Sequence, residues 1–303
     1  MHLGGIDSTP FFTMKVPFCF FYLCILVVAI ASCTPAARDG EVDQVTLKEE
    51  KTRNLFIIGG GSKPAGMLQF LLDSCVMNDG PVVILPWASS EPDTSAYYIA
   101  QDFTNVTDRE IAAFTVIPDS LSTKQLEQLK NAALIYITGG DQSRFMEAIS
   151  GTEVLNCIVQ SQANGSCVAG TSAGAAMMSQ WMITGDENFE PEYHSTYNKL
   201  WVGNGIYVPG LGLLDDAIID QHFVARSRYN RLLSAICEHP SLLGIGIDES
   251  TAAWINGSRL TVVGDSQVLL FYPPQSVNVS ERNISANGIQ IDILVAGDKI
   301  KLP

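Results

Sequence analysis

Short apolar runs alternate with helix-like stretches through the middle of the chain, and this alternation restricts the fold more than any other feature. The apolar runs are 55–58, 82–85, 113–117, 134–137 and 166–169, with helical patterns at 65–75, 95–103 and 122–130. Strands that are apolar at every position are buried on both faces, which is typical of a parallel sheet covered by its connecting helices. The sequence therefore predicts an α/β fold with a mostly parallel sheet and a functional site at the carboxyl ends of its strands.

From residue 243 onward, apolar runs follow one another without helical patterns between them. They cover 243–247, 251–255, 260–263 and 268–272 and are separated by turn signals such as Asn256-Gly257. This arrangement indicates an antiparallel meander that completes the same domain. We expect residues 54–303 to form a single α/β domain with a β-rich C-terminal end.

The beginning of the chain has a different character. Residues 16–30 are almost uninterruptedly apolar, which fits the central region of a signal peptide and is shorter than the roughly 20 residues of a membrane-spanning helix. The run leads into Ala31-Ser32-Cys33, which resembles the lipobox of bacterial lipoproteins. We expect a signal peptide over 1–33 with translation starting at Met14, lipidation of Cys33, and a flexible tether over 34–53. The protein would then be exported and lipid-anchored to a bacterial cell membrane; a cleaved secretory signal and an uncleaved single-pass anchor are the alternatives.

The charge balance excludes one large class of function. The chain has 18 Lys and Arg residues against 32 Asp and Glu residues, a formal net charge of -14, whereas a protein that binds a nucleic-acid backbone presents a basic face. An apolar share of 47% also excludes wholesale disorder. No His, Cys and carboxylate residues recur at the spacing of a metal site, so we expect neither a metal nor another cofactor.

Residues 170–174 read Gly-Thr-Ser-Ala-Gly and lie between an expected strand and a helical stretch. In this setting the pattern G-x-S-x-G is typical of a sharp turn that exposes a serine hydroxyl to a base and to a carbonyl group. The glycines are needed because such a turn brings neighbouring backbone too close for side chains. Ser172 is therefore the candidate nucleophile, and the Ala173 amide would point toward a developing oxyanion. A plain tight turn is the alternative.

A serine nucleophile needs a general base. Beyond the expected signal region the histidines are His194, His222 and His239. His239 precedes Pro240 at an expected helix end, and His194 lies in a tyrosine-rich loop. His222 ends an apolar strand, where the functional edge of the sheet is expected, so it is the candidate base; a hydrogen-bonded structural histidine is the alternative.

A third group should orient the imidazole and stabilise its charged form. Asp186, Glu187, Glu190 and Glu192 follow the turn closely, and most of them must be ordinary solvated acids. The order serine, acid, histidine also matches the α/β-hydrolases, but those enzymes carry their histidine near the C-terminus, and no histidine follows His239. The residues by themselves leave the identity of the acid open.

Several stretches together resemble a known family. GTSAGAA at 170–176, GGDQ at 139–142 and DQHFVARSRYNRL at 220–232 are similar to the cyanophycinase family of serine peptidases, which also contains peptidase E, an aspartyl dipeptidase. GGG at 59–61 and GIDE at 246–249 fit as well. The histidine-containing stretch is the specific part, because GTSAGAA alone marks only the wider family.

The resemblance implies a flavodoxin-like α/β fold related to class I glutamine amidotransferases, with a serine in place of their cysteine nucleophile. It implies Ser172 as the nucleophile and His222 as the base. Glu187 stands at the position that resembles the acid of peptidase E, so we expect Glu187 to complete the triad, with Asp186 and Glu190 as rivals.

Arg226, Arg228 and Arg231 follow the candidate base in an otherwise acidic chain. Guanidinium groups bind carboxylates through paired hydrogen bonds, although a solvated basic helix face is the alternative. With the resemblance, we expect all three to bind the substrate. The other expected contacts are Gln142 and Gln221 with the substrate backbone, Asp141 and Glu249 with a substrate arginine, and the Gly140 and Ala173 amides with the oxyanion.

The resemblance thus implies a serine exopeptidase that acts through an acyl-enzyme on cyanophycin, a polyaspartate chain with arginine on each β-carboxyl, at its β-aspartyl-arginine links. The expected signal peptide and lipobox add that the enzyme is exported. One alternative is an aspartyl or isoaspartyl dipeptidase of the same family, which would not need the arginines. Another is a non-catalytic surface lipoprotein that binds a ligand. The expected partner is a peptide substrate, membrane contact is expected only through the lipid anchor, and the sequence leaves the oligomeric state open, a homodimer included.

Overall fold

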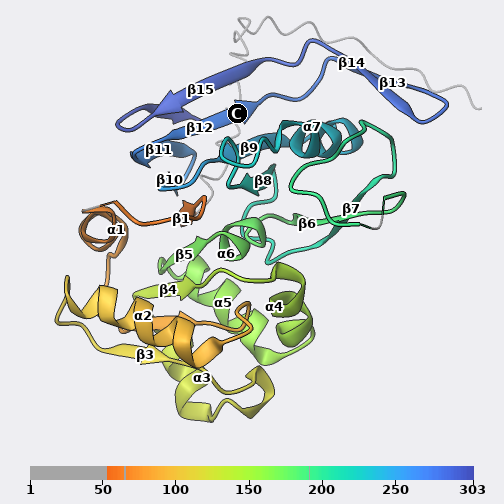
Figure 1. Cartoon of the computed structure of the whole chain (residues 1–303). Helices are drawn as coiled ribbons and strands as arrows, with labels where there is room; N and C mark the ends of the chain where they lie inside the picture. Colours follow the sequence, from red (N-terminus) through yellow and green to blue (C-terminus); the bar gives the residue numbers. More distant parts are fainter. Residues whose placement is uncertain (1–52, 65, 191) are drawn as a thin grey trace, which may run out of the picture. The chain divides into compact units, whose positions relative to one another are not determined.

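Within the described residues, an eight-stranded sheet forms the centre of the fold, in the order β16-β11-β10-β1-β5-β4-β2-β3. Figure 1 shows the arrangement of the elements. The structure is a computed structural model that describes residues 53–303 except 65 and 191, so the expected signal peptide and all but the last residue of the expected tether lie outside the described residues. The strands of this sheet are β1 (Asn54–Ile58), β2 (Val82–Leu85), β3 (Ile111–Ala113), β4 (Leu134–Ile137), β5 (Cys167–Thr171), β10 (Thr251–Asn256), β11 (Arg259–Gly264) and β16 (Lys299–Lys301).

Five neighbouring strands, β1, β5, β4, β2 and β3, run parallel. Because β1, β2 and β4 are buried at every position, both faces of the sheet must be covered, and helices cover them. α1 and α2 pack on the face with Phe56 and Ile58, and α3 to α6 pack on the face with Leu55 and Ile57. The helices are α1 (Met67–Cys75), α2 (Pro92–Thr104), α3 (Thr123–Lys130), α4 (Gln142–Ile149), α5 (Glu153–Ala163), α6 (Ala173–Ala176) and α7 (Tyr229–Glu238), with a 3₁₀ helix at Pro118–Ser120.

A four-stranded sheet in the order β15-β12-β9-β8 packs against this core. Its strands β8 and β9 are parallel and joined through α7, which covers one face of the sheet. The predicted α/β class, with a mostly parallel sheet and antiparallel strands toward the C-terminus, is confirmed. The strands outside the central sheet are β8 (Ala217–Gln221), β9 (Leu243–Ile247), β12 (Gln267–Phe271) and β15 (Ile291–Val295), together with the hairpins β6 (Trp181–Glu187) with β7 (Gly205–Pro209) and β13 (Ser276–Ser280) with β14 (Asn283–Asn287).

Two predicted details are wrong. The strand expected at 113–117 is Ile111–Ala113; its partner β2 ends at Leu85, and the next residue, Pro86, has no N–H to continue the pairing. The last strands also do not form one meander, because β9 and β12 lie in the four-stranded sheet while β10 and β11 lie in the central sheet. The chain changes sheets after β9, and this change brings the end of β9 to the end of β1.

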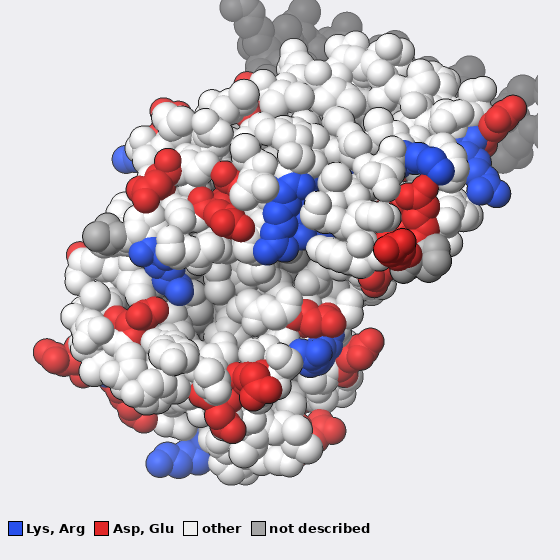
Figure 2. Space-filling model, in the orientation of Figure 1, with Lys and Arg blue, Asp and Glu red and all other residues white. Residues whose placement is uncertain are grey.

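On the face shown in Figure 2, acidic and basic side chains are scattered, with acidic ones more numerous and no continuous basic patch. None of the helices among the described residues combines the length and the apolar character that a membrane crossing requires.

Candidate active site

Ser172 lies on a sharp turn between β5 and the short helix α6. Its backbone has φ 56° and ψ -112°, a region that non-glycine residues rarely occupy outside strained functional turns. The flanking glycines allow close packing: a Cβ on Gly170 would lie 2.3 Å from the carbonyl oxygen of Gly174, and one on Gly174 would lie 2.5 Å from that of Ile137. The turn therefore has the geometry typical of a G-x-S-x-G nucleophile.

His222 faces Ser172 from the other sheet. It directly follows β8, and its φ of 49° is also positive. The distance between Ser172 Oγ and His222 Nε2 is 2.8 Å, which is hydrogen-bond distance. His239 lies elsewhere and stacks on Trp181. The structure thus brings together the two residues expected to act as nucleophile and base.

The acid beside the imidazole is Glu249. Its Oε1 lies 2.5 Å from His222 Nδ1, and its side chain is 39% exposed. The sequence predicts that Glu249 meets a substrate arginine, and the structure corrects this prediction. Ser172, His222 and Glu249 form a chain of two hydrogen bonds, which is the arrangement of a serine-peptidase triad.

Glu187, the acid expected at this place, does not reach the imidazole. It is buried near the end of β6, and its Oε2 accepts a hydrogen bond from Asn204 Nδ2 at 2.5 Å. Asp186 is exposed, and Glu190 pairs with Lys199 at 2.8 Å. All three acids lie close to Ser172 in sequence, but the β6–β7 hairpin carries them away from His222.

Strand pairing explains why Glu249 takes this place. β8 and β9 are parallel neighbours, with Gln221 opposite Ile247. The residues that follow two such strands emerge at the same edge of the sheet, so His222 and Glu249 meet although 27 residues separate them. The sequence carried a signal for this contact, since two apolar runs lead into polar residues, Asp220-Gln221-His222 and Asp248-Glu249.

Three successive carbonyl groups at the end of β1 hold the turns of the site together. Each accepts the backbone N–H of a residue in, or next to, the triad, so one strand end fixes all three turns. The bonds are Ser172 N–H to Ile58 at 3.0 Å, His222 N–H to Gly59 at 2.7 Å, and Ser250 N–H to Gly60 at 2.9 Å.

Gly60 and Gly61 allow the loop after β1 to pass directly against the triad. Both have positive φ, 105° and 70°. A Cβ on Gly60 would lie 2.3 Å from Cε1 of His222, and one on Gly61 would lie 2.9 Å from Cβ of Glu249. Any side chain at Gly60 would therefore push the imidazole out of its position.

Burial lowers the pKa of His222; the hydrogen bond to Glu249 opposes this effect, and the charge of Arg226 adds to it. The imidazole is therefore neutral at neutral pH. When its Nδ1–H donates to the Glu249 carboxylate, Nε2 is left as an acceptor for the Ser172 hydroxyl proton. The site can thus deprotonate a serine during nucleophilic attack.

The two predicted oxyanion donors flank the nucleophile. Gly139 and Gly140 follow β4, the neighbour of β5, and a Cβ on Gly139 would lie 3.3 Å from Cβ of Ser172. Ala173 is the first residue of α6, and the first N–H groups of a helix have no partner within it.

A cavity of about 300 Å³ opens beside Ser172. Asp186 contributes an exposed carboxylate to its wall, although this residue was expected only as a rival triad acid. The cavity is also lined by all six side chains predicted to bind substrate: Asp141, Gln142, Gln221, Arg226, Arg228 and Arg231.

Two of the three arginines have internal partners. Arg231 is buried, and its Nε and Nη2 both donate to the Asp220 carboxylate, the Nε bond at 2.8 Å. Arg228 is also buried; its Nη1 donates to Gln221 Oε1 at 2.8 Å and its Nη2 to the Tyr193 hydroxyl at 3.3 Å. These two arginines shape the cavity wall, so the expectation that all three serve mainly to bind carboxylates is corrected.

Arg226 is different, because it is exposed and its guanidinium makes no hydrogen bond or ion pair with any described residue. Asp141 instead caps α4, accepting two backbone amides of its first turn at 2.8 and 3.1 Å. Gln142 Nε2 donates to two carbonyl groups of β6 at 3.1 and 2.6 Å. Asp141 and Gln142 thus both have partners within the protein.

Because Arg228 and Arg231 also have internal partners, Arg226 is the arginine of the three that is best placed to take a ligand carboxylate.

Asp248 also supports the site, and it was not expected from the sequence. Its Oδ1 accepts the N–H groups of Val224 and Ala225, at 3.0 and 2.8 Å, and its Oδ2 accepts the Ser266 hydroxyl at 2.6 Å. These bonds fix the turn that follows His222.

In residues 53–64, 66–190 and 192–303, no three His, Cys, Asp or Glu side chains are grouped as metal ligands.

Comparisons with known proteins agree with this geometry. The profile of peptidase family S51 matches residues 55–263. A cyanophycinase from Trichormus variabilis is 31% identical over 292 residues, covering 91% of this chain and 94% of the relative, and one from Synechococcus elongatus is 30% identical over 254 residues, covering 80% and 76%.

Two solved structures share the fold. A peptidase from an acI-B1 Actinobacterium aligns with a TM-score of 0.59 and 22% identity, covering 82% of this chain and 97% of that one. A peptidase E-like protein from Listeria monocytogenes aligns with a TM-score of 0.50 and 20% identity, covering 71% and 99%.

Proposed function

Because the chain belongs to peptidase family S51 and is a serine-type peptidase, we propose that it hydrolyses cyanophycin through an acyl-enzyme intermediate. The observation that carries this proposal is the hydrogen-bonded chain from Ser172 through His222 to Glu249, together with a cavity beside Ser172 that holds an exposed guanidinium and an exposed carboxylate. The similarity to two cyanophycinases over most of their length supports the choice of substrate.

In this mechanism, neutral His222 takes the proton of the Ser172 hydroxyl as Oγ attacks the carbonyl carbon of the substrate. Glu249 holds the imidazole by its Nδ1–H and stabilises the imidazolium. The Gly140 and Ala173 amides stabilise the negative oxygen of the tetrahedral intermediate, each donor contributing on the order of 3 kcal/mol. The imidazolium then protonates the leaving nitrogen, and a water molecule activated by His222 hydrolyses the acyl-enzyme.

The cavity contents support recognition of a substrate that carries both signs of charge. Cyanophycin presents free α-carboxylates and guanidinium groups on its arginyl units. Arg226 has an unengaged guanidinium for a carboxylate, and Asp186 has an exposed carboxylate for a guanidinium. A substrate with only one of these groups would leave part of the cavity unused.

The test is a product assay with purified protein. Incubation with cyanophycin should release arginine or aspartyl-arginine dipeptide, which chromatography separates and identifies, and Ser172→Ala should abolish release. Ser90→Ala, which changes an exposed serine, is the matched control. Full hydrolysis by Ser172→Ala would overturn the mechanism.

The same assay separates the alternatives. An aspartyl dipeptidase would hydrolyse aspartyl dipeptides with a higher kcat/KM than cyanophycin. A ligand-binding lipoprotein without activity would release nothing, and its Ser172 would not react with a fluorophosphonate.

The place of action is a separate part of the proposal. The apolar run and the Ala31-Ser32-Cys33 motif support export and lipidation at Cys33, so the enzyme would degrade polymer released outside its own cell. In the producing bacterium, the protein should fractionate with membranes and incorporate labelled palmitate, and Cys33→Ser should lose the label. Unprocessed protein in the cytosol would argue against export without affecting the assignment of activity.

A further inference from the structure

Ser172 lines one cavity, and the residue before it, Thr171, lines another. One is the cavity of about 300 Å³ that holds Arg226. The other, of about 270 Å³, is lined by Gly139 and Thr171, the residues directly before Gly140 and Ser172. A peptidase needs one binding site for the acyl group and another for the leaving group, on opposite sides of the reacting carbonyl. The second cavity is a candidate for one of these two sites.

The position of the imidazole indicates which side takes the leaving group. His222 must protonate the leaving nitrogen, so the leaving group departs past the imidazole. Gly60 packs against the His222 ring, and the chain continues from there into Ser62 and Lys63. Lys63 lines the second cavity, so the loop that packs on the imidazole also forms part of this cavity.

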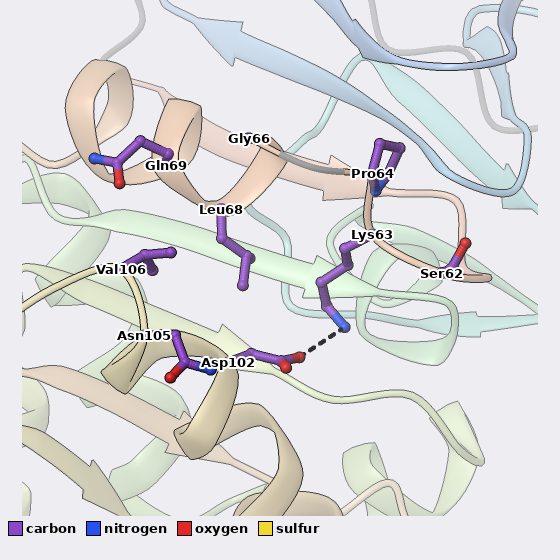
Figure 3. A pocket seen from close by; sticks show the side chains of 9 residues that line it. All are labelled: Ser62, Lys63, Pro64, Gly66, Leu68, Gln69, Asp102, Asn105 and Val106. Atoms are coloured by element: carbon purple, nitrogen blue, oxygen red, sulfur yellow. Dashed lines mark ion pairs between the residues drawn. The ribbon is translucent and has the colours of Figure 1, made fainter.

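An ion pair closes the far end of the second cavity. Lys63, from the loop after β1, and Asp102, from α2, point toward each other (Figure 3), with Nζ 3.8 Å from Oδ2. Both residues also line a further open cavity of about 430 Å³. The pair is long, and the Asp102 side chain is 49% exposed, so the two charges can separate easily to bind opposite charges of a ligand.

Two tyrosines add binding groups to the same cavity. Tyr98 is 66% exposed, and its ring offers a face on which a guanidinium can stack. Tyr136 is buried, and no described group reaches its hydroxyl with good hydrogen-bond geometry, although the Thr171 side chain lies close to it. Burial raises the pKa of Tyr136, and the Asp102 charge adds to the effect, so the phenol stays protonated and can donate.

We propose that the cavity lined by Gly139, Thr171 and the Lys63–Asp102 pair is the leaving-group subsite and binds a zwitterionic arginyl unit. Asp102 and Tyr98 take the guanidinium, and Lys63 takes the α-carboxylate. The inference rests on the proposed action on cyanophycin. It holds for either amide of the polymer, because the leaving group is arginine when the side-chain amide is hydrolysed and the next aspartyl-arginine unit when the backbone amide is hydrolysed.

The test measures binding without catalysis. Calorimetry with the Ser172→Ala variant compares β-aspartyl-arginine with β-aspartyl-citrulline, in which a neutral group of the same shape replaces the guanidinium, and with β-aspartyl-agmatine, which lacks the α-carboxylate. We expect each analogue to bind about tenfold more weakly than β-aspartyl-arginine, as for the loss of one charged hydrogen-bonded contact.

Second-site variants assign each contact. In the Ser172→Ala background, Asp102→Asn should abolish the preference for arginine over citrulline and keep the preference over agmatine, whereas Lys63→Met should do the reverse. Glu147→Gln, an exposed acid on α4, should leave both preferences unchanged.

The outcomes separate this inference from the proposed function. Equal affinities for the three ligands, absent binding, or preferences that survive both Asp102→Asn and Lys63→Met would overturn the subsite. A wild-type protein that releases nothing from cyanophycin would overturn the proposed function, whatever the calorimetry gives. The three-ligand comparison in Ser172→Ala would also detect recognition by Arg226 and Asp186, so the Asp102 and Lys63 variants assign the preferences to this cavity. If either variant fails to fold, Asp102→Ser or Lys63→Gln replaces it.

Discussion

His222 Nδ1 lies 2.5 Å from Glu249 Oε1, and this contact joins the ends of the parallel strands β8 and β9. This contact identifies which of two glutamates is the acid of the triad. Glu249 is placed to orient the base, whereas Glu187 is buried against Asn204 and has no contact with the imidazole.

Replacing Glu249 should therefore reduce catalysis far more than replacing Glu187. Glu249→Gln removes the charge that fixes the tautomer of His222, and kcat should fall by about 10,000-fold, as for the buried acid of a serine triad. Steady-state kinetics on cyanophycin measures the change. Glu187→Gln is the matched control and should alter kcat by less than about threefold; the opposite ranking of the two variants would restore Glu187 as the acid.

The pH dependence of kcat/KM should show a base with a lowered pKa. Protonated His222 cannot accept the serine proton, so activity is lost as the pH falls through the pKa of this histidine. Because burial lowers that pKa below 6.5, activity should persist below pH 6.5. The charge of Arg226 contributes to the lowering, so Arg226→Gln should move the acid limb to higher pH. An acid limb centred above 6.5 in the unmodified protein would contradict the assignment.

Gly60→Ala should inactivate the enzyme without unfolding it. The added Cβ would lie 2.3 Å from Cε1 of His222, so the imidazole must move away from Ser172, and a shift of about 1 Å costs on the order of 100-fold in rate. Gly151→Ala is the control, because Gly151 also has positive φ but its Cβ would meet nothing within 4 Å. Kinetics and circular dichroism of both variants separate the clash from backbone strain.

The buried pair of Arg231 and Asp220 should contribute mainly to stability. Arg231→Met removes both side-chain hydrogen bonds of the buried Asp220 carboxylate and leaves the longer ion pair with Arg228, at 3.7 Å. This change should lower the free energy of unfolding by about 3 kcal/mol. Denaturant unfolding measures this loss. The double variant Arg231→Met/Asp220→Leu should recover most of it, and a double variant no more stable than the single one would show that the pair is not the cause.

Arg226 should act on substrate binding. Because its guanidinium has no partner among the described residues, Arg226→Gln should raise KM for cyanophycin by about tenfold and change kcat little. Arg259→Gln, on the exposed side of β11, is the control. An unchanged KM would remove Arg226 from the substrate site.

The parts of the fold that follow from local patterns could be predicted from the sequence. The strands at 82–85 and 134–137 have the expected bounds, because uninterrupted apolar runs between turn signals are recognised without tertiary information. The resemblance to the cyanophycinase family is confirmed as well, since its motifs are local stretches of sequence. Ser172 and His222 were identified because each ends a strand of this kind.

The triad acid and the roles of the arginines could not be predicted, because they depend on which strands and side chains become neighbours in the folded protein. Glu249 was misjudged because the meander was expected to keep β9 beside β10, whereas β9 pairs with β8 and β12. The arginines were misjudged for a related reason. Three basic residues in one segment look equivalent in a sequence. Only packing shows that Arg231 lies against Asp220, while the guanidinium of Arg226 has no partner in the part of the chain that the structure describes.

The triad lies at the boundary between the two sheets. Ser172 follows a strand of the eight-stranded sheet, whereas His222 and Glu249 follow strands of the four-stranded sheet. The carbonyl groups at the end of β1 bind the backbone of all three turns. A small displacement of one sheet relative to the other would therefore break the Ser172–His222 hydrogen bond and stop catalysis, while the hydrogen bonds between strands within each sheet stayed intact. Catalytic rate should then be a more sensitive gauge of sheet alignment than any spectroscopic probe of secondary structure.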